Sequence, residues 1–215
     1  MTTIAFFDFD GTITQKDTLW EIIRFHRGSM RMYLGVVKLL PALIRFKLKQ
    51  LPAQEMKQRV FRYYFGEMTE EDFNAGCADF CRNRLPAIIR PQALTAIRKH
   101  QEQGHRIVVV TASAENWVSP WCASLQIGCI GTRLETRDAR ISGNILGINC
   151  NGTEKVNRIR QQFRLEDYQE IFAYGDSEGD KPMLALAHHA AFRPFRDKKK
   201  MPRHKGEALF IIVTD

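Results

Sequence analysis

The chain has 215 residues, of which 44% are hydrophobic and 26% charged, and its formal net charge is +8 at pH 7. This composition suits one core-forming domain, or one domain with an inserted module, and excludes a disordered, collagen-like or disulfide-scaffold protein. No run of about 18 uncharged apolar residues predicts a membrane-spanning helix, and no secretion signal is recognisable. Five scattered cysteines without a CxxC pair favour reduced thiols, so we expect a cytoplasmic protein.

The pattern of apolar residues predicts strands that alternate with helices. A buried strand begins near Ile4 and ends at the carboxylates of Asp8 and Asp10. Residues 17–80 are predicted to be helical, without a convincing strand and with breaks at Gly28, Pro41, Pro52 and Gly66. The elements expected after this segment are a helix over 91–103, a strand over 105–111, a helix over 115–125, a short strand near 129, a hairpin over 132–147 with turns at 137–138 and 142–143, a helix over 153–163, a strand over 170–175, a helix over 180–187 and a strand over 190–193.

This alternation predicts an α/β fold, a Rossmann-like doubly wound parallel sheet with helices on both faces. The all-helical segment interrupts the alternation directly after the first strand, so we interpret it as an inserted cap. We therefore expect a catalytic core of residues 1–14 and 88–197 and a helical cap of residues 15–87. Residues 198–215 are expected to form a loosely held basic tail, in which 209–213 have the composition of a short strand.

The basic residues gather in two segments. Residues 24–62 contain ten Lys or Arg against the single acid Glu55, and residues 193–205 contain seven against Asp197. The rest of the chain is therefore acidic. This placement suggests an anionic partner near one face of the molecule.

Polar side chains follow the predicted strands at the points where the strands end or the next helix begins. In an open α/β sheet the ligand site lies beyond the carboxyl ends of the strands. The residues concerned are Asp8, Asp10, Thr111, Lys155, Asp176 and Asp180.

Their chemistry predicts a site for a hard metal ion and a phosphate. Carboxylates from Asp8 and Asp176, together with Asp10, form an all-oxygen ligand set that suits Mg²⁺. A carboxylate beside such an ion can attack phosphorus, and we expect Asp8 to become an aspartyl phosphate. Asp10 is then placed to act as general acid and base, while Lys155 offsets negative charge on the phosphoryl group.

Four ordered motifs of the chain resemble those of the haloacid dehalogenase-like superfamily. They are Asp8-Phe9-Asp10-Gly11-Thr12, Val110-Thr111, Lys155 and Gly175-Asp176-Ser177-Glu178-Gly179-Asp180. The helical insert after the first motif resembles the phosphoserine-phosphatase-like branch, subfamily IB. The resemblance implies that Asp8 is the nucleophile and Asp10 the acid/base, that Asp8, the Asp10 carbonyl and Asp176 hold Mg²⁺, and that Asp180 supports the metal site. It also implies that Thr111, Ala112, Gly11 and Lys155 bind phosphate.

The resemblance suggests a phosphomonoester hydrolase, because dehalogenases lack an acid at the position of Asp10. Within the branch, an acid in the cap holds the substrate amino group and an arginine holds its carboxylate, which implies Asp17 and Arg59 here. The second motif departs from the usual Ser-Gly-Gly, since the chain has Thr111-Ala112-Ser113. Asp17 as a helix N-cap and Arg59 as a solvated helix residue are equally consistent with the pattern.

The cap segment also allows a second substrate class. Arg24, Arg31, Lys38 and Arg45 recur every seven residues beside a broad apolar surface, a pattern that fits a helix in an anionic membrane interface. A branch resembling phosphatidylglycerophosphatase acts on a lipid phosphate, so a lipid or headgroup phosphate is the alternative to a small metabolite of phosphoserine type. The protein would then lie peripherally at the membrane. The competing interpretation is that these apolar residues form the interior of the cap and that the basic side chains are simply solvated.

Two other functional classes remain open at this point. The fold could serve as a catalytically silent phosphate-binding or partner-binding module, or as a phosphotransferase that passes the phosphoryl group to an alcohol. Nucleic acid is not an expected partner, because no aromatic platform or recognised motif accompanies the basic residues.

Overall fold

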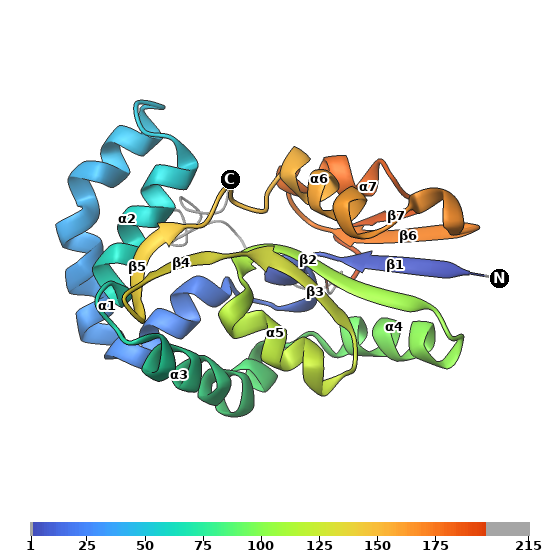
Figure 1. Cartoon of the computed structure of the whole chain (residues 1–215), viewed down its shortest axis with the longest axis horizontal. Coiled ribbons are helices and arrows are strands. Elements are labelled where there is room, and N and C mark those ends of the chain that lie inside the picture. The colour runs from blue at the N-terminus through green and yellow to red at the C-terminus, as the bar shows by residue number, and fades with distance from the viewer. Residues whose placement is uncertain (1, 197–215) are drawn as a thin grey trace.

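A computed structural model describes residues 2–196, in which a parallel sheet carries helices on both faces and a cap at one end (Figure 1). Within these residues the sheet has the strand order β3-β2-β1-β6-β7, and every pair is parallel. Its strands are β1 (Thr3–Phe7), β2 (Arg106–Ala114), β3 (Gly128–Thr132), β6 (Glu170–Gly175) and β7 (His189–Phe192). The predicted Rossmann-like fold is confirmed.

Two apolar clusters cover the two faces of the sheet. Alternate residues of β1 point to opposite sides, so Ile4 and Phe6 belong to one cluster and Ala5 and Phe7 to the other. The first cluster includes residues of the helices α6 (Thr153–Gln162) and α7 (Lys181–Leu184), and the second includes residues of α4 (Pro91–Glu102) and α5 (Glu115–Ser124). Figure 1 shows these helix pairs on either side of the sheet. The central strand is thus buried on both faces, which fixes the position of the site at its end.

The cap follows β1 and a tight turn at Phe9–Ile13. It contains the helices α1 (Thr18–Lys47), α2 (Ala53–Phe65) and α3 (Glu70–Asn83). The expected break at Gly28 is a kink, because this glycine has φ of 75° inside α1. The expected break at Pro41 is wrong, since α1 continues through it. Proline removes one hydrogen bond to the residue four positions earlier, and that residue, Val37, is exposed, so water can satisfy its carbonyl.

The hairpin of β4 (Leu134–Arg137) and β5 (Arg140–Ile145) packs against the cap rather than joining the sheet. Ile141 accepts a hydrogen bond from the Glu67 amide (3.1 Å) and donates one to the Met68 carbonyl (2.9 Å). The second predicted hairpin turn is wrong, because Gly143 lies inside β5. Its φ is 79°, and a Cβ atom there would lie 2.4 Å from the Arg62 Cα. This glycine therefore permits close approach of the hairpin to α2.

No helix in residues 2–196 is long and apolar enough to cross a membrane. All five cysteines are free thiols, and four of them are buried. The predicted basic tail, 198–215, with its short strand at 209–213, lies outside the described residues.

Candidate active site

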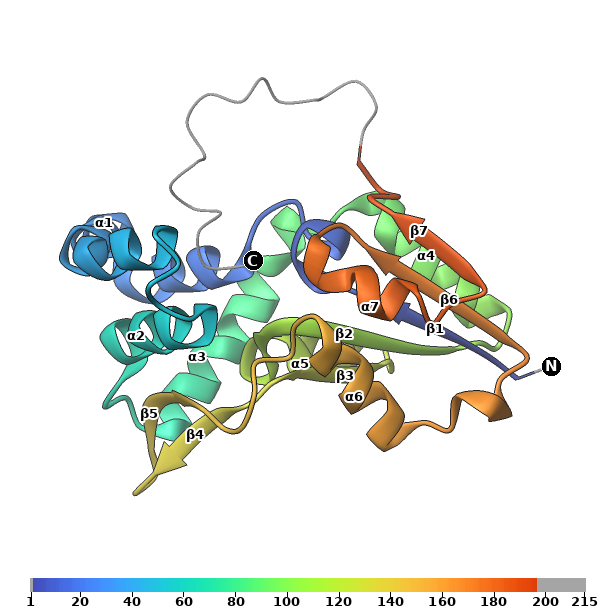
Figure 2. The ribbon, with the colours of Figure 1, turned by 90° about the horizontal axis from the view of Figure 1, so that it is seen from above.

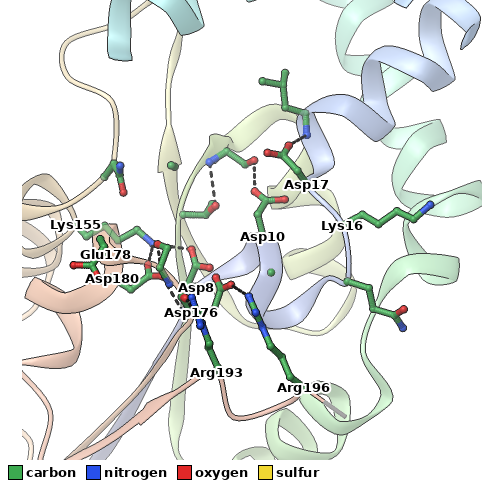
Figure 3. A pocket seen from close by; sticks show the side chains of 18 of the residues that line it. Asp8, Asp10, Lys16, Asp17, Lys155, Asp176, Glu178, Asp180, Arg193 and Arg196 are labelled. Carbon is green, nitrogen blue, oxygen red and sulfur yellow. Dashed lines mark hydrogen bonds and ion pairs between the residues drawn. The ribbon is translucent and has the colours of Figure 1, made fainter. Parts of the chain in front are cut away.

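A cavity of about 500 Å³ opens between the carboxyl ends of β1, β2 and β6 and the first residues of the cap (Figure 3). The six residues that the sequence singled out for catalysis and phosphate binding line it, as does Asp180, the predicted support of the metal site: Asp8, Asp10, Gly11, Thr111, Ala112, Lys155 and Asp180. The metal-ligand candidate Asp176 and the substrate-ligand candidate Asp17 also line it, but Arg59 does not. Residues from distant parts of the chain meet here because parallel strands end at the same edge of the sheet.

Lys155 connects two carboxylates at the base of the cavity. It lies in the first turn of α6, and its side chain is 1% exposed. The Nζ atom donates to Asp8 Oδ1 (2.7 Å), to Asp180 Oδ1 (2.6 Å) and to the Val110 carbonyl (2.9 Å). All three N–H groups of the ammonium are therefore used, and Lys155 holds one oxygen of Asp8 while the other remains directed to the cavity.

The loop after β6 positions Asp176 and Asp180. The second oxygen of Asp180 accepts hydrogen bonds from the amides of Asp176 (3.0 Å) and Ser177 (2.9 Å) and from the Ser177 hydroxyl (2.8 Å). Asp180 thus accepts four hydrogen bonds on its two oxygens, which indicates a supporting role. The Asp176 carboxylate approaches the Gly11 backbone, where a Cβ atom would lie 2.5 Å from Asp176 Oδ2. Gly11 also has φ of 79°, so glycine is required at this turn.

Asp10 is held by the start of the cap and by β2. Its Oδ1 accepts from the Thr18 amide (2.7 Å) and its Oδ2 from the Ser113 hydroxyl (2.5 Å). The Ser113 oxygen also lies 3.1 Å from the Thr18 hydroxyl, which accepts from Trp117 Nε1 (3.0 Å). This network fixes the Asp10 side chain, and no sequence motif indicated that Ser113 belongs to it.

The phosphate-binding candidates of the second motif line the cavity from β2. Thr111 is buried, and its Oγ1 accepts the Ser113 amide at 3.0 Å, so its own hydroxyl proton remains available to a ligand. The Ala112 carbonyl accepts from Lys57 Nζ (2.8 Å) and from the Thr132 hydroxyl (2.6 Å).

Burial dominates the electrostatics of the acidic cluster. The carboxylates of Asp8, Asp176 and Asp180 bring ligand atoms within 4.8 Å of one another. Burial, reinforced by Asp180, raises the pKa of Asp8 well above its ordinary value, and burial also raises the pKa of Asp176. Burial alone would lower the pKa of Lys155, but Asp8 and Asp180 raise it, so this lysine stays charged. The cluster consequently favours additional positive charge.

The cap side of the cavity holds an acid and a base. Asp17 is the N-cap of α1, where its Oδ1 accepts the Leu19 amide at 2.8 Å, while its Oδ2 is buried without a partner among the described residues. Burial and the nearby Asp10 charge raise the pKa of Asp17 to about 7. Lys57 is 4% exposed, and burial lowers its pKa to about 8. Its Nζ donates to Ala112 and to Asn149 Oδ1 (3.1 Å), which leaves one N–H for a ligand.

Arg59 lies away from the cavity and pairs with Glu55 at 2.8 Å, one helical turn earlier. The helix period could have distinguished it from Lys57, because Lys57 shares a face with the buried Val60 and Phe61 and Arg59 does not.

Two arginines after β7 are cavity residues that the motifs did not reveal. Arg193 Nε donates to the Asp176 carbonyl at 3.0 Å, and Arg196 Nη2 donates to Asp176 Oδ2 at 2.5 Å. Figure 3 shows both side chains directed to the acidic cluster. Their only signal in the sequence was the general basic character of residues 193–205.

The chain is similar to known proteins over most of its length. The family model for haloacid dehalogenase-like hydrolases matches residues 5–185. Protein CicA of Caulobacter vibrioides is 36% identical over 194 residues, which cover 89% of this chain and 86% of the relative. Histidinol-phosphatase of Neisseria meningitidis is 25% identical, with 96% of this chain and 97% of that protein covered.

The solved structure of a substrate-bound phosphoserine phosphatase has the same fold, with a TM-score of 0.65 and 17% identity over 89% of this chain and 86% of that chain. The chain belongs to the haloacid dehalogenase-like hydrolase family and is a hydrolase of the phosphatase type.

Proposed function

We propose that the protein hydrolyses a small phosphomonoester in a Mg²⁺-dependent reaction that passes through an aspartyl phosphate on Asp8. The observation that carries the proposal is the Lys155 ammonium held between Asp8 and Asp180 at the base of the cavity. It fixes one oxygen of Asp8 and leaves the other free to react. A silent binding module would need no such preorganised carboxylate.

In the first step, the free Asp8 oxygen forms a bond to phosphorus while the bond from phosphorus to the ester oxygen breaks. Asp10 donates the proton that the leaving oxygen requires. In the second step, Asp10 takes a proton from water, whose oxygen attacks phosphorus and releases inorganic phosphate from Asp8. Ser113 and the Thr18 amide hold the Asp10 carboxylate throughout, and Lys155 offsets charge on the phosphoryl oxygens.

The residues present fit Mg²⁺. The Asp8 and Asp176 carboxylates and the Asp10 carbonyl would hold it, and these are hard oxygen donors. The raised pKa values of Asp8 and Asp176 mark a cluster that Lys155 and Arg196 together do not neutralise. When bound, the ion supplies positive charge to the transferring phosphoryl group. Asp180, whose oxygens are already engaged, supports Lys155 and the Asp176 loop.

The cap side of the cavity favours a small substrate that carries charged or polar groups. The unpartnered Asp17 oxygen can accept an ammonium or hydroxyl, and the remaining N–H of Lys57 can donate to a carboxylate or hydroxyl. Phosphorylated amino acids and amino alcohols have this pattern, and they include the substrate class named for the histidinol-phosphatase relative. A lipid or headgroup phosphate is the second substrate class.

Turnover of p-nitrophenyl phosphate, followed by a panel of phosphate esters, tests the proposal. The panel contains phosphoserine, histidinol phosphate, a sugar phosphate and a lipid phosphate, each with excess Mg²⁺ or with EDTA. We expect phosphate release that EDTA abolishes and Mg²⁺ restores, with the amino-bearing esters preferred. Equal activity with EDTA would contradict the metal assignment, and transfer to an added alcohol in place of water would identify a phosphotransferase.

A further inference from the structure

Helix α1 carries a second apolar face on the side away from the rest of the cap. Its buried face includes Met32, Val36 and Leu43. The exposed apolar side chains, with their exposed fractions, are Met30 79%, Tyr33 51%, Leu34 56%, Val37 66%, Leu40 43% and Ile44 51%, followed by Leu48 62% at the C-cap. Successive members lie mostly three or four residues apart, so at 100° per residue they form one continuous stripe opposite the buried face.

This stripe is the largest gathering of exposed apolar side chains in the part of the chain that the structure describes. Elsewhere the large exposed apolar residues are isolated or paired, as at Leu146 and Ile148. Scattered apolar residues need no explanation, whereas a contiguous exposed stripe marks an interaction surface. Figures 1 and 2 show α1 and α2 at one end of the molecule, so a large partner can reach this face.

Cations border the stripe. On a helical projection, Arg31, Lys38 and Arg45 lie along one boundary between the exposed and buried faces, and Lys47 lies at the other. Lys38 is held near α2, with its Nζ 5.8 Å from the centre of the Tyr63 ring. No acidic residue occurs between Glu21 and Glu55. The surface therefore combines apolar side chains with uncompensated positive charge.

We propose that this face of α1 docks on an anionic lipid bilayer, with the helix lying in the interface. Apolar side chains enter the acyl boundary while the bordering cations remain at the headgroups. A symmetric contact between the stripes of two copies fits less well, because it would place one cationic border against another without an acid to pair with. The inference goes beyond the proposed function, and its test does not depend on catalysis.

Cosedimentation of the full chain with vesicles tests the inference. One set contains phosphatidylcholine alone and the other phosphatidylcholine with phosphatidylglycerol. We expect binding to the anionic vesicles to be at least about tenfold tighter and to weaken as salt is raised. The double variant Val37→Glu/Ile44→Glu should lower anionic-vesicle binding at least about tenfold, since it places charge on the inserted face.

The matched control is Leu146→Glu/Ile148→Glu, which changes two side chains that are 54% and 59% exposed on another surface. It should bind vesicles as the unchanged protein does, and both double variants should keep their turnover of p-nitrophenyl phosphate. Absence of binding at low salt, or equal binding by all variants, would overturn the inference. So would sedimentation velocity showing a dimer that Val37→Glu/Ile44→Glu converts to monomer, because the stripe would then join two copies.

Discussion

The two sides of the cavity differ in how their charges are satisfied. On the core side, Lys155 uses all three of its N–H groups, and both Asp180 oxygens accept hydrogen bonds, from Lys155, two backbone amides and the Ser177 hydroxyl. On the cap side, Asp17 has a buried oxygen without a partner among the described residues, and Lys57 retains a free N–H. A network in which the polar groups have hydrogen-bond partners keeps one geometry, whereas buried polar groups without partners are available to bind a ligand. This difference supports the proposal that the core side carries the chemistry and that the cap side selects the substrate.

The sharpest test of the core side is Asp8→Asn. Asparagine keeps an acceptor for Lys155 but lacks the nucleophilic carboxylate, so kcat for p-nitrophenyl phosphate should fall by roughly 10³-fold or more. Steady-state kinetics measures this, with thermal melting to verify folding. The control Asp167→Asn, at an exposed position, should retain full activity. Comparable turnover by the two variants would remove Asp8 from the mechanism.

Removal of the Lys155 ammonium group should have the largest effect on stability. Lys155→Met leaves Asp8 and Asp180 buried without their common partner, which should lower the free energy of unfolding by about 3–5 kcal/mol at pH 7. Acidification should recover part of the loss as the two acids become protonated. Urea unfolding measures both effects.

The matched control for this loss is Lys181→Met, whose partner Glu178 and own side chain are exposed. A surface pair contributes less than about 1 kcal/mol, so this variant should change stability little. Equal losses in the two lysine variants would show that the buried network does not stabilise the site.

An intermediate effect is expected at Ser113, which lies in the core strand β2 and contacts Thr18 at the start of the cap. Ser113→Ala removes the hydroxyl that donates to Asp10, so kcat should fall about 10-fold to 100-fold with little change in KM. Ser124→Ala, which removes a hydroxyl bonded only to a helix carbonyl, is the control. A change in KM alone would assign Ser113 to binding.

The smallest expected effect concerns Asp17 and has a defined pH window. Its pKa in the folded protein, about 7, lies above its ordinary value of 3.8, because burial disfavours the ionised form. Asp17 therefore reduces stability progressively as pH rises from about 4 to 7. Asp17→Asn keeps an N-cap acceptor and should be more stable than the unchanged protein by about 1–2 kcal/mol at pH 8, with little difference at pH 4.

Urea unfolding in metal-free buffer across this range measures the difference. A constant offset at every pH would mean that Asp17 ionises normally and that its ionised form does not destabilise the folded protein.

The sequence predicted the core side well, because its residues occupy the ends of buried strands. Asp8, Thr111 and Asp176 follow apolar runs whose alternation defines a parallel sheet, and such a sheet brings its carboxyl ends together. Local pattern and tertiary contact therefore agree there. The order of the strands and the pairing of Lys155 with both acids required the structure.

The cap side was predicted less well, because helical pattern alone leaves the mutual orientation of helices open. Arg59 was chosen by resemblance, whereas Lys57 occupies the buried face of α2. Gly143 was interpreted as a turn, although its backbone conformation serves close packing against Arg62. In both cases a contact between segments distant in sequence decided the outcome.

The central claim is that Asp8 carries the phosphoryl group, and acid quenching during turnover tests it directly. The quenched protein is reduced with borohydride, which converts an acyl phosphate of aspartate to homoserine, and its peptides are analysed by mass spectrometry. We predict homoserine at position 8, in amounts that rise when Ser113→Ala slows hydrolysis of the intermediate. Homoserine at another acid, or none at any position during active turnover, would contradict the account.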